Sequence, residues 1–366
     1  MALQVGIVGL PNVGKSTLFN ALTSAKAEAA NYPFCTIDPN VGVVSIPDPR
    51  LEKITQFIKP QSVVPTTMEF VDIAGIVAGA HKGEGLGNQF LSHIRQTDAI
   101  VHVVRCFDDP NIIHVSGSVD PLRDMEIIST ELMLADLESI EKKRLRVEKN
   151  AKTSTDKKIK QEFEVIKKIH EALGKGLPAR SVQLDDLEIP FAKDLHLLTF
   201  KPVLYACNVK EDDFVKGGNE WVKSVQKRAN EEGNSSLMIC SAMEAEIAQL
   251  PKEEQKEFLS SLGATEPGLN RLILEAYKLL SLYTYFTAGV KEVRAWTIKE
   301  GMKAPQAAGV IHTDFERGFI KAECYHCEDL FNLKSEAAVK EAGKYRIEGK
   351  EYVVKDGDVL FFRFNV

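Results

Sequence analysis

The chain has 366 residues, of which 44% are hydrophobic, so it can bury a substantial core in two or three structural units. Its net charge of −6, from 46 Lys and Arg against 52 Asp and Glu, excludes a protein whose whole surface coats nucleic acid or anionic lipid. The N-terminal residues lack the basic stretch and apolar core of a signal peptide, and no segment approaches the ~20 apolar residues that span a bilayer. We therefore expect a soluble cytoplasmic protein without a membrane partner.

The first half of the chain alternates short β-branched runs with segments of helical periodicity, which predicts a largely parallel sheet with helices on both faces. Strands are expected at 3–8, 41–46, 68–71 and 100–104, and helices at 15–23, 50–58 and 86–95. From residue 124 the pattern changes to a helical hairpin with its turn near 150–156, and strands at 203–207 and 237–240 then resume the sheet. The hairpin is thus predicted to be an insertion.

After residue 283, short strands joined by polar turns indicate a separate small β-rich domain. We expect strands at 293–298, 309–311, 319–323, 352–354 and 359–364, and a helix near 304–308.

The segment GLPNVGKS at 9–16 matches G-x-x-x-x-G-K-[ST] and lies between the first predicted strand and helix, where a phosphate-binding loop (P-loop) must lie. Its backbone N–H groups would cradle phosphates at a helix N-terminus. Lys15 would add positive charge at the β- and γ-phosphates, as a catalytic group, and Ser16 would give an oxygen to Mg²⁺. The residues expected to contact nucleotide here are Asn12, Val13, Gly14, Lys15, Ser16 and Thr17.

Asp72 and Gly75, in the sequence DIAG, follow a predicted strand, where the carboxylate can hold the Mg²⁺ shell and the glycine N–H can meet the γ-phosphate. Thr36 lies in a loop that a γ-phosphate and Mg²⁺ could order, so we expect it to be a third metal ligand beside Ser16 and Asp72. A plain turn threonine is a fair alternative for Thr36.

Ile76 occupies the place where Ras-like enzymes carry the glutamine that orients the attacking water. An alkyl side chain cannot form a hydrogen bond, so another group must position water or hydrolysis must be slow. The hypothesis for a catalytic residue is His114, in the loop after the fourth predicted strand. A solvent-exposed loop histidine is nearly as good an interpretation.

GTPases read guanine with Asn-Lys-x-Asp after a strand, and here the corresponding residues are Asn208, Val209, Lys210 and Glu211. The lysine stem is lost and the acid is one methylene longer, which relaxes the barrier against adenine. Ser241 and Ala242, after the next strand, would offer backbone groups to the base. Because the barrier against adenine is relaxed, we expect ATP to bind. A degenerate guanine site with weak GTP preference remains the alternative.

Two further features invite a functional interpretation. The pair Cys324 and Cys327 lacks a second pair of ligands at the spacing of a zinc site, so we interpret both as strand cysteines. The run 141–180 is rich in Lys and Arg. A solvated helical face is the usual explanation, but ribosomal RNA bound through its phosphates is a credible partner.

These motifs together resemble the YchF/Obg-like ATPase family, a branch of the Obg-related P-loop proteins, over essentially the whole chain. The motifs that carry the resemblance are at 9–16, YPFCT at 32–36, DIAG followed by Ile76, NVKE at 208–211, YFTAG at 285–289 and the C-terminal segment 356–364. The resemblance implies ATP preferred over GTP, slow hydrolysis, a coiled-coil insertion and a ubiquitin-like C-terminal TGS domain. It also implies ribosome association and a regulatory role in translation or stress.

The resemblance also assigns residues. His114 lies where the family carries its proposed catalytic histidine, and Asn12 coincides with the asparagine that cation-dependent relatives use for K⁺, so K⁺ is expected as a second cofactor beside Mg²⁺. Cys35 departs from the second threonine of many Obg relatives and leaves Thr36 as the expected ligand. No DNA specificity is expected.

The predicted fold is an α/β P-loop NTPase sheet with an inserted helical coiled-coil hairpin and a C-terminal ubiquitin-like domain. The expected boundaries are 1–123 and 200–282 for the nucleotide-binding domain, 124–199 for the insertion and 283–366 for the TGS domain. The predicted function is a ribosome-associated ATPase that acts as a switch. A nucleotide-dependent binding module with incidental hydrolysis and an ordinary Obg-type GTPase are the alternatives.

Overall fold

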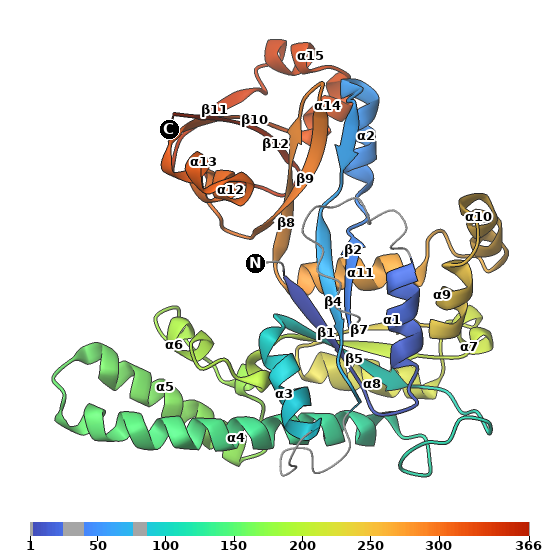
Figure 1. Ribbon diagram of the computed structural model, residues 1–366, viewed down its shortest axis with the longest axis vertical. Helices are drawn as coiled ribbons and strands as arrows, with labels where there is room; N and C mark the ends of the chain where they lie inside the picture. The colour runs from blue at the N-terminus through green and yellow to red at the C-terminus, as the bar shows by residue number, and fades with distance from the viewer. Residues whose placement is uncertain (1–2, 25–39, 76–85, 366) are drawn as a thin grey trace. The chain divides into compact units, whose positions relative to one another are not determined.

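The computed structural model describes residues 3–24, 40–75 and 86–365 (Figure 1). The chain divides into two compact units. Unit 1 consists of Met1–Val44 with Glu69–Ala276, and unit 2 of Ser45–Met68 with Tyr277–Val366.

The sheet of unit 1 has the strand order β2-β4-β1-β5-β6-β7, and β1 pairs in parallel with both β4 and β5, as β6 does with β5 and β7. The central strands β5 and β6 are buried along their whole length, as expected of a parallel sheet covered on both faces. The strands are β1 (Gln4–Val8), β2 (Val41–Ser45), β4 (Thr67–Asp72), β5 (Ala99–Arg105), β6 (Val203–Asn208) and β7 (Ser235–Ile239).

Helices α1 and α3 pack against β1, and α8 packs against β6 and β7. Because the strands are parallel, their carboxyl ends meet at one edge, where the loops to α1, α7 and α9 begin. The helices of this layer are α1 (Lys15–Ser24), α3 (Leu86–Gln96), α7 (Glu211–Val215), α8 (Glu220–Glu231), α9 (Ser241–Ile247), α10 (Lys252–Ser261) and α11 (Gly268–Leu279).

A helical arm, formed by α4 (Pro121–Thr153) and α5 (Lys157–Gly174), is inserted between β5 and β6 (Figure 1). Each helix begins at an aspartate N-cap: Asp120 accepts from Arg123 N–H, and Asp156 accepts from Lys158 N–H. Ile140 and Val147 of α4 pack against Val165, Ile166 and Ile169 of α5. The short elements η4 (Ala179–Ser181), α6 (Ile189–Lys193) and η5 (Leu198–Phe200) lead back to the sheet.

Unit 2 is built on a second sheet with the order β11-β10-β12-β8-β9-β3, in which β8–β9 and β10–β12 are antiparallel and β12–β8 is parallel. The elements are α2 (Pro49–Ile58), β3 (Ser62–Val64), β8 (Leu282–Ala288), β9 (Glu292–Lys299), α12 (Ala304–Ile311), α13 (Thr313–Arg317), β10 (Phe319–His326), α14 (Cys327–Leu333), α15 (Glu336–Glu341), β11 (Arg346–Glu348) and β12 (Asp358–Phe364).

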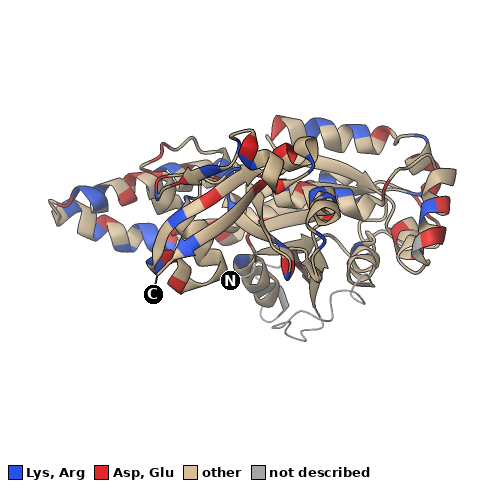
Figure 2. Cartoon of the chain, turned by 90° about the horizontal axis from the view of Figure 1, so that it is seen from above, with Lys and Arg blue, Asp and Glu red and all other residues tan. Residues whose placement is uncertain are grey.

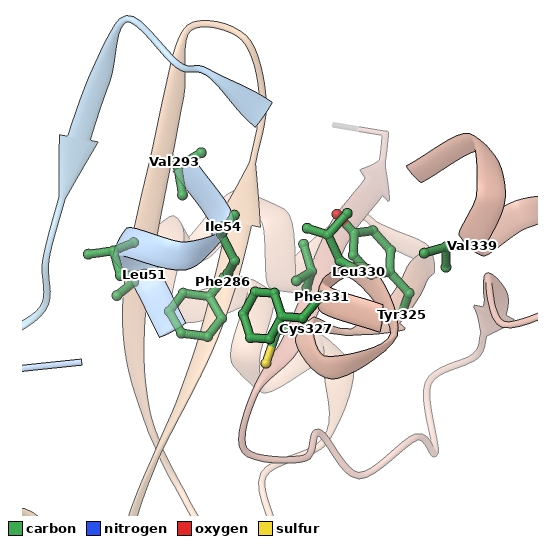
Figure 3. Close-up of a cluster of buried hydrophobic side chains, with 11 residues drawn as sticks. Leu51, Ile54, Phe286, Val293, Tyr325, Cys327, Leu330, Phe331 and Val339 are labelled. Carbon is green, nitrogen blue, oxygen red and sulfur yellow. The ribbon is translucent and has the colours of Figure 1, made fainter. Parts of the chain in front are cut away.

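Helix α2 comes from the first fifth of the chain but belongs to the core of unit 2. Figure 3 shows Leu51 and Ile54 of α2 against Phe286, in a cluster that also holds Phe331 of α14. The segment Ser45–Met68 is therefore part of unit 2, whereas the sequence pattern assigned it to the nucleotide-binding domain.

Three predictions about unit 2 are wrong. Residues 309–311 are the last turn of α12, not a strand, because Ala304, Ala307 and Ala308 are buried at helical spacing and Pro305 lies in the first turn of the helix. Residues 352–354 form only an isolated bridge, between Val353 and Lys303. Cys327 is the first residue of α14 and not a strand residue.

Candidate nucleotide-binding site

A cavity of about 630 Å³ opens at the carboxyl ends of β1 and β4 in unit 1. The P-loop forms one wall, the end of β4 a second and α3 a third. The lining residues are Leu10, Pro11, Asn12, Gly14, Lys15, Ser16, Thr17, Asn40, Asp72, Ala74, Gly75, Gln89, Phe90 and His93.

The P-loop turns sharply between β1 and α1. Asn12 and Gly14 both have positive φ, 62° and 92°, which places them in the left-handed region. Successive backbone amides in such a turn point inward and form a concave anion site, and the N-terminus of α1 adds its dipole. A side chain at position 14 would collide with the amide nitrogen of Asn208, so the loop requires a glycine there for space as well as for φ.

Lys15 is buried and its Nζ donates to the Asp72 carboxylate at the end of β4. The predicted phosphate and metal groups are thus brought together. Ser16 is exposed at the cavity, so the Ser16 hydroxyl and the Asp72 carboxylate are both hard oxygen donors facing one space, which fits the ligand set of Mg²⁺. A magnesium–nucleotide complex would give Lys15 the phosphates and Asp72 the metal as new partners. Thr36, the third predicted ligand, lies outside the described residues.

Gly75 lies against the P-loop: a Cβ there would be 3.4 Å from Gly9 O and 3.5 Å from Pro11 N. Its backbone is therefore at the position where an amide could meet a terminal phosphate. Ile76, which replaces the water-orienting glutamine, lies outside the described residues. Three lining residues of α3, Gln89, Phe90 and His93, were not predicted, because an amphipathic helix pattern gives no signal for which polar residues face a ligand.

His114 does not line the cavity. It is 7% exposed, its Nε2 lies 2.8 Å from Asp124 Oδ2, and its Nδ1 accepts from Ser116 N–H at 3.1 Å. Both ring nitrogens are therefore engaged, and neither is open to a water molecule. Burial raises the pKa of Asp124, against the opposing hydrogen bond from His114. The interpretation as an exposed loop histidine is wrong, and in this conformation His114 fastens its loop to the first turn of α4.

Asn208 of the base-reading motif acts as a brace. It is 4% exposed, its Nδ2 donates to Val13 O of the P-loop at 2.8 Å, and its Oδ1 accepts from Ser241 N–H at 2.9 Å. One side chain therefore joins the P-loop, β6 and α9. The Ser241 hydroxyl is buried without a hydrogen-bond partner among the described residues.

Val209 and Glu211, the two positions at which the motif departs from Asn-Lys-x-Asp, differ in exposure. Val209 is 3% exposed, and its amide donates to Ile239 O, so it packs inward and cannot lie over a base as a lysine stem would. Glu211 is exposed at the first residue of α7, and Ala242 is exposed in the first turn of α9. The Glu211 side chain and the first turn of α9 are thus exposed to solvent at the carboxyl ends of β6 and β7.

The described cysteines, Cys106, Cys207, Cys240, Cys324 and Cys327, are all free and buried. Burial raises the pKa of the Cys324 and Cys327 thiols to about 12 each, so both are protonated at neutral pH. Within the described part of the chain, no helix is both long and apolar enough to cross a bilayer.

Family models match both ends of the chain. Residues 4–150 match the model described as "50S ribosome-binding GTPase", and residues 282–365 match a C-terminal model described as "Protein of unknown function (DUF933)". The sequence is 59% identical to "Ribosome-binding ATPase YchF" of Bacillus subtilis and 57% identical to the protein of that name in Haemophilus ducreyi, with all of this chain and all of each relative covered. The chain belongs to the YchF family.

A solved structure agrees with this membership. The "Structure of the Schizosaccharomyces pombe YchF GTPase" superposes with a TM-score of 0.89 at 42% identity, covering 99% of this chain and 97% of that one. The predicted fold class is confirmed: an α/β P-loop NTPase sheet, a helical insertion and a C-terminal β-rich domain. The predicted enzyme class, a P-loop nucleotide hydrolase, is confirmed as well.

Proposed function

We propose that this YchF-family protein is a ribosome-associated ATPase of the cytoplasm that binds and slowly hydrolyses ATP in preference to GTP and acts as a switch in translation or stress. The relatives named "Ribosome-binding ATPase" support both parts of this proposal, ATP hydrolysis and ribosome binding. The observation that carries the base preference is the arrangement of the Asn208 motif, in which Val209 is buried and Glu211 is exposed. A guanine site needs a lysine stem and an aspartate at these two positions.

Calorimetry with non-hydrolysable ATP and GTP analogues, in Mg²⁺ and K⁺, tests the base preference. Tighter ATP binding is expected. Glu211→Asp should shift the affinity ratio toward GTP, because the shorter acid restores the carboxylate that pairs with guanine, whereas Glu211→Gln should not. Tighter GTP binding by the unmodified protein would contradict the proposal.

Mg²⁺ is proposed as the resident cofactor, held by Ser16, Asp72 and Thr36, where it would bridge and neutralise phosphate oxygens. K⁺ is proposed as a second cation at Asn12, which lines the cavity. Hydrolysis should be faster in K⁺ than in Na⁺ buffer at equal ionic strength, and equal rates would count against the K⁺ site.

The tip of the helical arm is the proposed contact with ribosomal RNA. Lys and Arg residues occur along both helices (Figure 2), but toward the base of the arm several form ion pairs with acids, such as Lys142 with Glu138 and Lys168 with Glu188. Near the tip, Lys152 pairs with Glu148, and the other basic residues form no ion pair among the described residues. These exposed basic residues are Lys149, Lys157, Lys158 and Lys160.

Phosphate-led binding at the tip should weaken with salt. If Lys157→Glu and Lys158→Glu are combined, the slope of log affinity for ribosomes against log salt should fall by about 0.7–0.9 per lost phosphate contact. Lys142→Glu, a charge reversal nearer the base of the arm, is the control and should change the slope little. Ribosome binding that persists undiminished in high salt would contradict the RNA contact.

A binding module with incidental hydrolysis is the second candidate, and the engagement of both His114 nitrogens supports it. His114→Ala should lower turnover and leave nucleotide affinity intact if His114 becomes the catalytic group after leaving Asp124. Complementation of a gene deletion by such a slow variant would favour the module, and failure to complement would favour turnover as the function.

A further inference from the structure

Arg105 is a buried cation beside the P-loop that none of the motifs accounts for. It is the last residue of β5, is 1% exposed, and is the largest fully buried side chain of the described residues. Its guanidinium also lies over the Phe107 ring, 4.6 Å from the ring centre. A fully buried arginine is unusual unless a counter-charge or a functional demand keeps it there.

The guanidinium donates to three backbone carbonyls. Nε donates to Phe107 O at 3.0 Å, Nη2 to Ile112 O at 3.0 Å and Nη1 to Asn12 O at 3.5 Å. Asn12 in turn donates from its Nδ2 to Ile113 O at 3.1 Å. Arg105, the P-loop and the loop after β5 therefore form a closed ring of hydrogen bonds.

The ring holds Asn12 in the left-handed conformation, which asparagine adopts more readily than any other residue except glycine. A φ of 62° is still less favourable for asparagine than the right-handed region, and the hydrogen bonds of the ring hold the residue there. Arg105 bonds the backbone of Asn12, and Ile113 bonds its side chain. The curvature of the P-loop therefore depends on Arg105 directly and, through Ile112, on the loop that Arg105 fastens.

The positive charge of Arg105 has no ion-pair partner in the described part of the chain. The nearby Asp109 is half-buried, and the hydrogen bond from Asn111 N–H and, more weakly, the charges of Lys210 and Arg105 lower the pKa of its carboxyl. Its carboxylate pairs with Lys210 Nζ at 3.6 Å and not with Arg105. Carbonyl oxygens solvate a guanidinium but do not neutralise it, and a buried unpaired charge is unfavourable. A nucleotide in the cavity would bring several negative charges to the other side of Asn12.

We propose that Arg105 is a positioning residue for nucleotide binding, which holds Asn12 in the left-handed conformation of the P-loop and adds a buried positive charge that favours the phosphate chain. The proposal rests on the P-loop nucleotide site and not on base preference, because ATP and GTP carry the same phosphates.

Three variants test the proposal. Arg105→Met keeps length and apolar volume but removes the charge and the donors. Arg105→Lys keeps the charge but cannot reach three carbonyls at once. Arg180→Met is the matched control, since Arg180 belongs to the same unit, also donates to a backbone carbonyl, Thr199 O at 3.1 Å, and does not line the cavity.

Dissociation constants for a non-hydrolysable ATP analogue, ADP and AMP, with Mg²⁺, are measured by competition with a fluorescent nucleotide, and thermal unfolding is followed without nucleotide. Arg105→Met should bind the ATP analogue about ten- to a hundredfold more weakly, as for the loss of charge-assisted hydrogen bonds. The loss should shrink from the ATP analogue to ADP to AMP, and Arg105→Lys should be intermediate. Arg180→Met should bind like the unmodified protein.

Wild-type affinity of a folded Arg105→Met would overturn the proposal, and so would an equal loss for AMP and the ATP analogue, because a purely structural residue would not distinguish phosphate number. If Arg105→Met does not fold, Arg105→Lys decides: weakened binding supports the proposal, and wild-type affinity contradicts it. If neither variant folds, Arg105 serves the fold and the proposal is wrong.

Discussion

Substitution of Asn208 tests whether this residue supports the P-loop or recognises the nucleotide base. Its side chain joins Val13 O to Ser241 N–H, and both partners are buried. Asn208→Ala leaves a carbonyl and an amide without partners, at about 1–3 kcal/mol each, so the free energy of unfolding should fall by about 2–6 kcal/mol. A side chain that only supports the P-loop has the same effect on ATP as on GTP. ATP and GTP analogues should therefore lose affinity by the same factor, within about twofold.

Asn219→Ala is the matched control. Asn219 also makes partly buried contacts with both ends of its amide: it donates to Cys106 O at 2.9 Å and accepts from Val222 N–H at 3.0 Å, which caps α8. No hydrogen bond among the described residues joins it to the P-loop. It should cost about 1–2 kcal/mol of stability and leave nucleotide affinity near that of the unmodified protein. Urea denaturation and calorimetry on both variants measure the two effects. A loss at Asn208 that is selective for one base would refute the bracing role.

Three further perturbations have defined outcomes. Gly14→Ala should abolish nucleotide binding, measured by calorimetry, because its Cβ collides with the Asn208 amide and its φ is 92°. Asp124→Asn should change the free energy of unfolding by less than about 1 kcal/mol, since an amide oxygen can still accept from His114, while Asp124→Ala should lose about 1–3 kcal/mol in urea. Burial lowers the pKa of His102 to about 4. As the pH falls below 6.5, His102 therefore takes up a proton in the unfolded chain but not in the folded one. The free energy of unfolding should fall by up to about 1.4 kcal/mol per pH unit between pH 6.5 and 4. His102→Gln should flatten that slope in denaturation curves.

The phosphate site was predictable because its information is local. The P-loop can be recognised from its own glycines, lysine and serine and from the strand and helix that flank them, and Asp72 can be recognised from its place at the end of a strand. Parallel strands bring their carboxyl ends to one edge, so Lys15 and Asp72 meet although 57 residues separate them. Local pattern and sheet topology together are sufficient for this part of the site.

The roles of Asn208, His114 and Arg105 were not predictable, because each depends on partners chosen by the tertiary fold. Asn208 bonds residues 195 and 33 positions away, and Arg105 reaches the P-loop across 93 positions. His114 has its partner only ten positions on, but burial of the pair depends on how α4 packs. A polar residue in a loop pattern gives no signal of whether it faces a ligand or the backbone of another loop.

The assignment of Ser45–Met68 to unit 2 has a consequence for switching. This segment is anchored in unit 2 by the pairing of β3 with β9 and by the Thr66 and Thr297 hydroxyls, 2.7 Å apart. Its two ends continue into β2 and β4, and the β4 end reaches Asp72, whose amide donates to Asn40 O at 2.8 Å. Both covalent connections therefore begin within a few residues of the phosphate cavity, which Asn40 and Asp72 line.

A nucleotide that draws Asp72 toward a metal should therefore alter the protection of α2 and β3, which lie between these two connections. Hydrogen exchange of the full chain, with and without a Mg²⁺–ATP analogue, measures this, and Lys15→Ala, which should bind phosphate poorly, is the control. We expect changed exchange in α2 amides in the unmodified protein and none in the control. Protection confined to the P-loop and β4, with α2 and β3 unchanged at saturating nucleotide, would show that the inserted segment does not transmit the bound state.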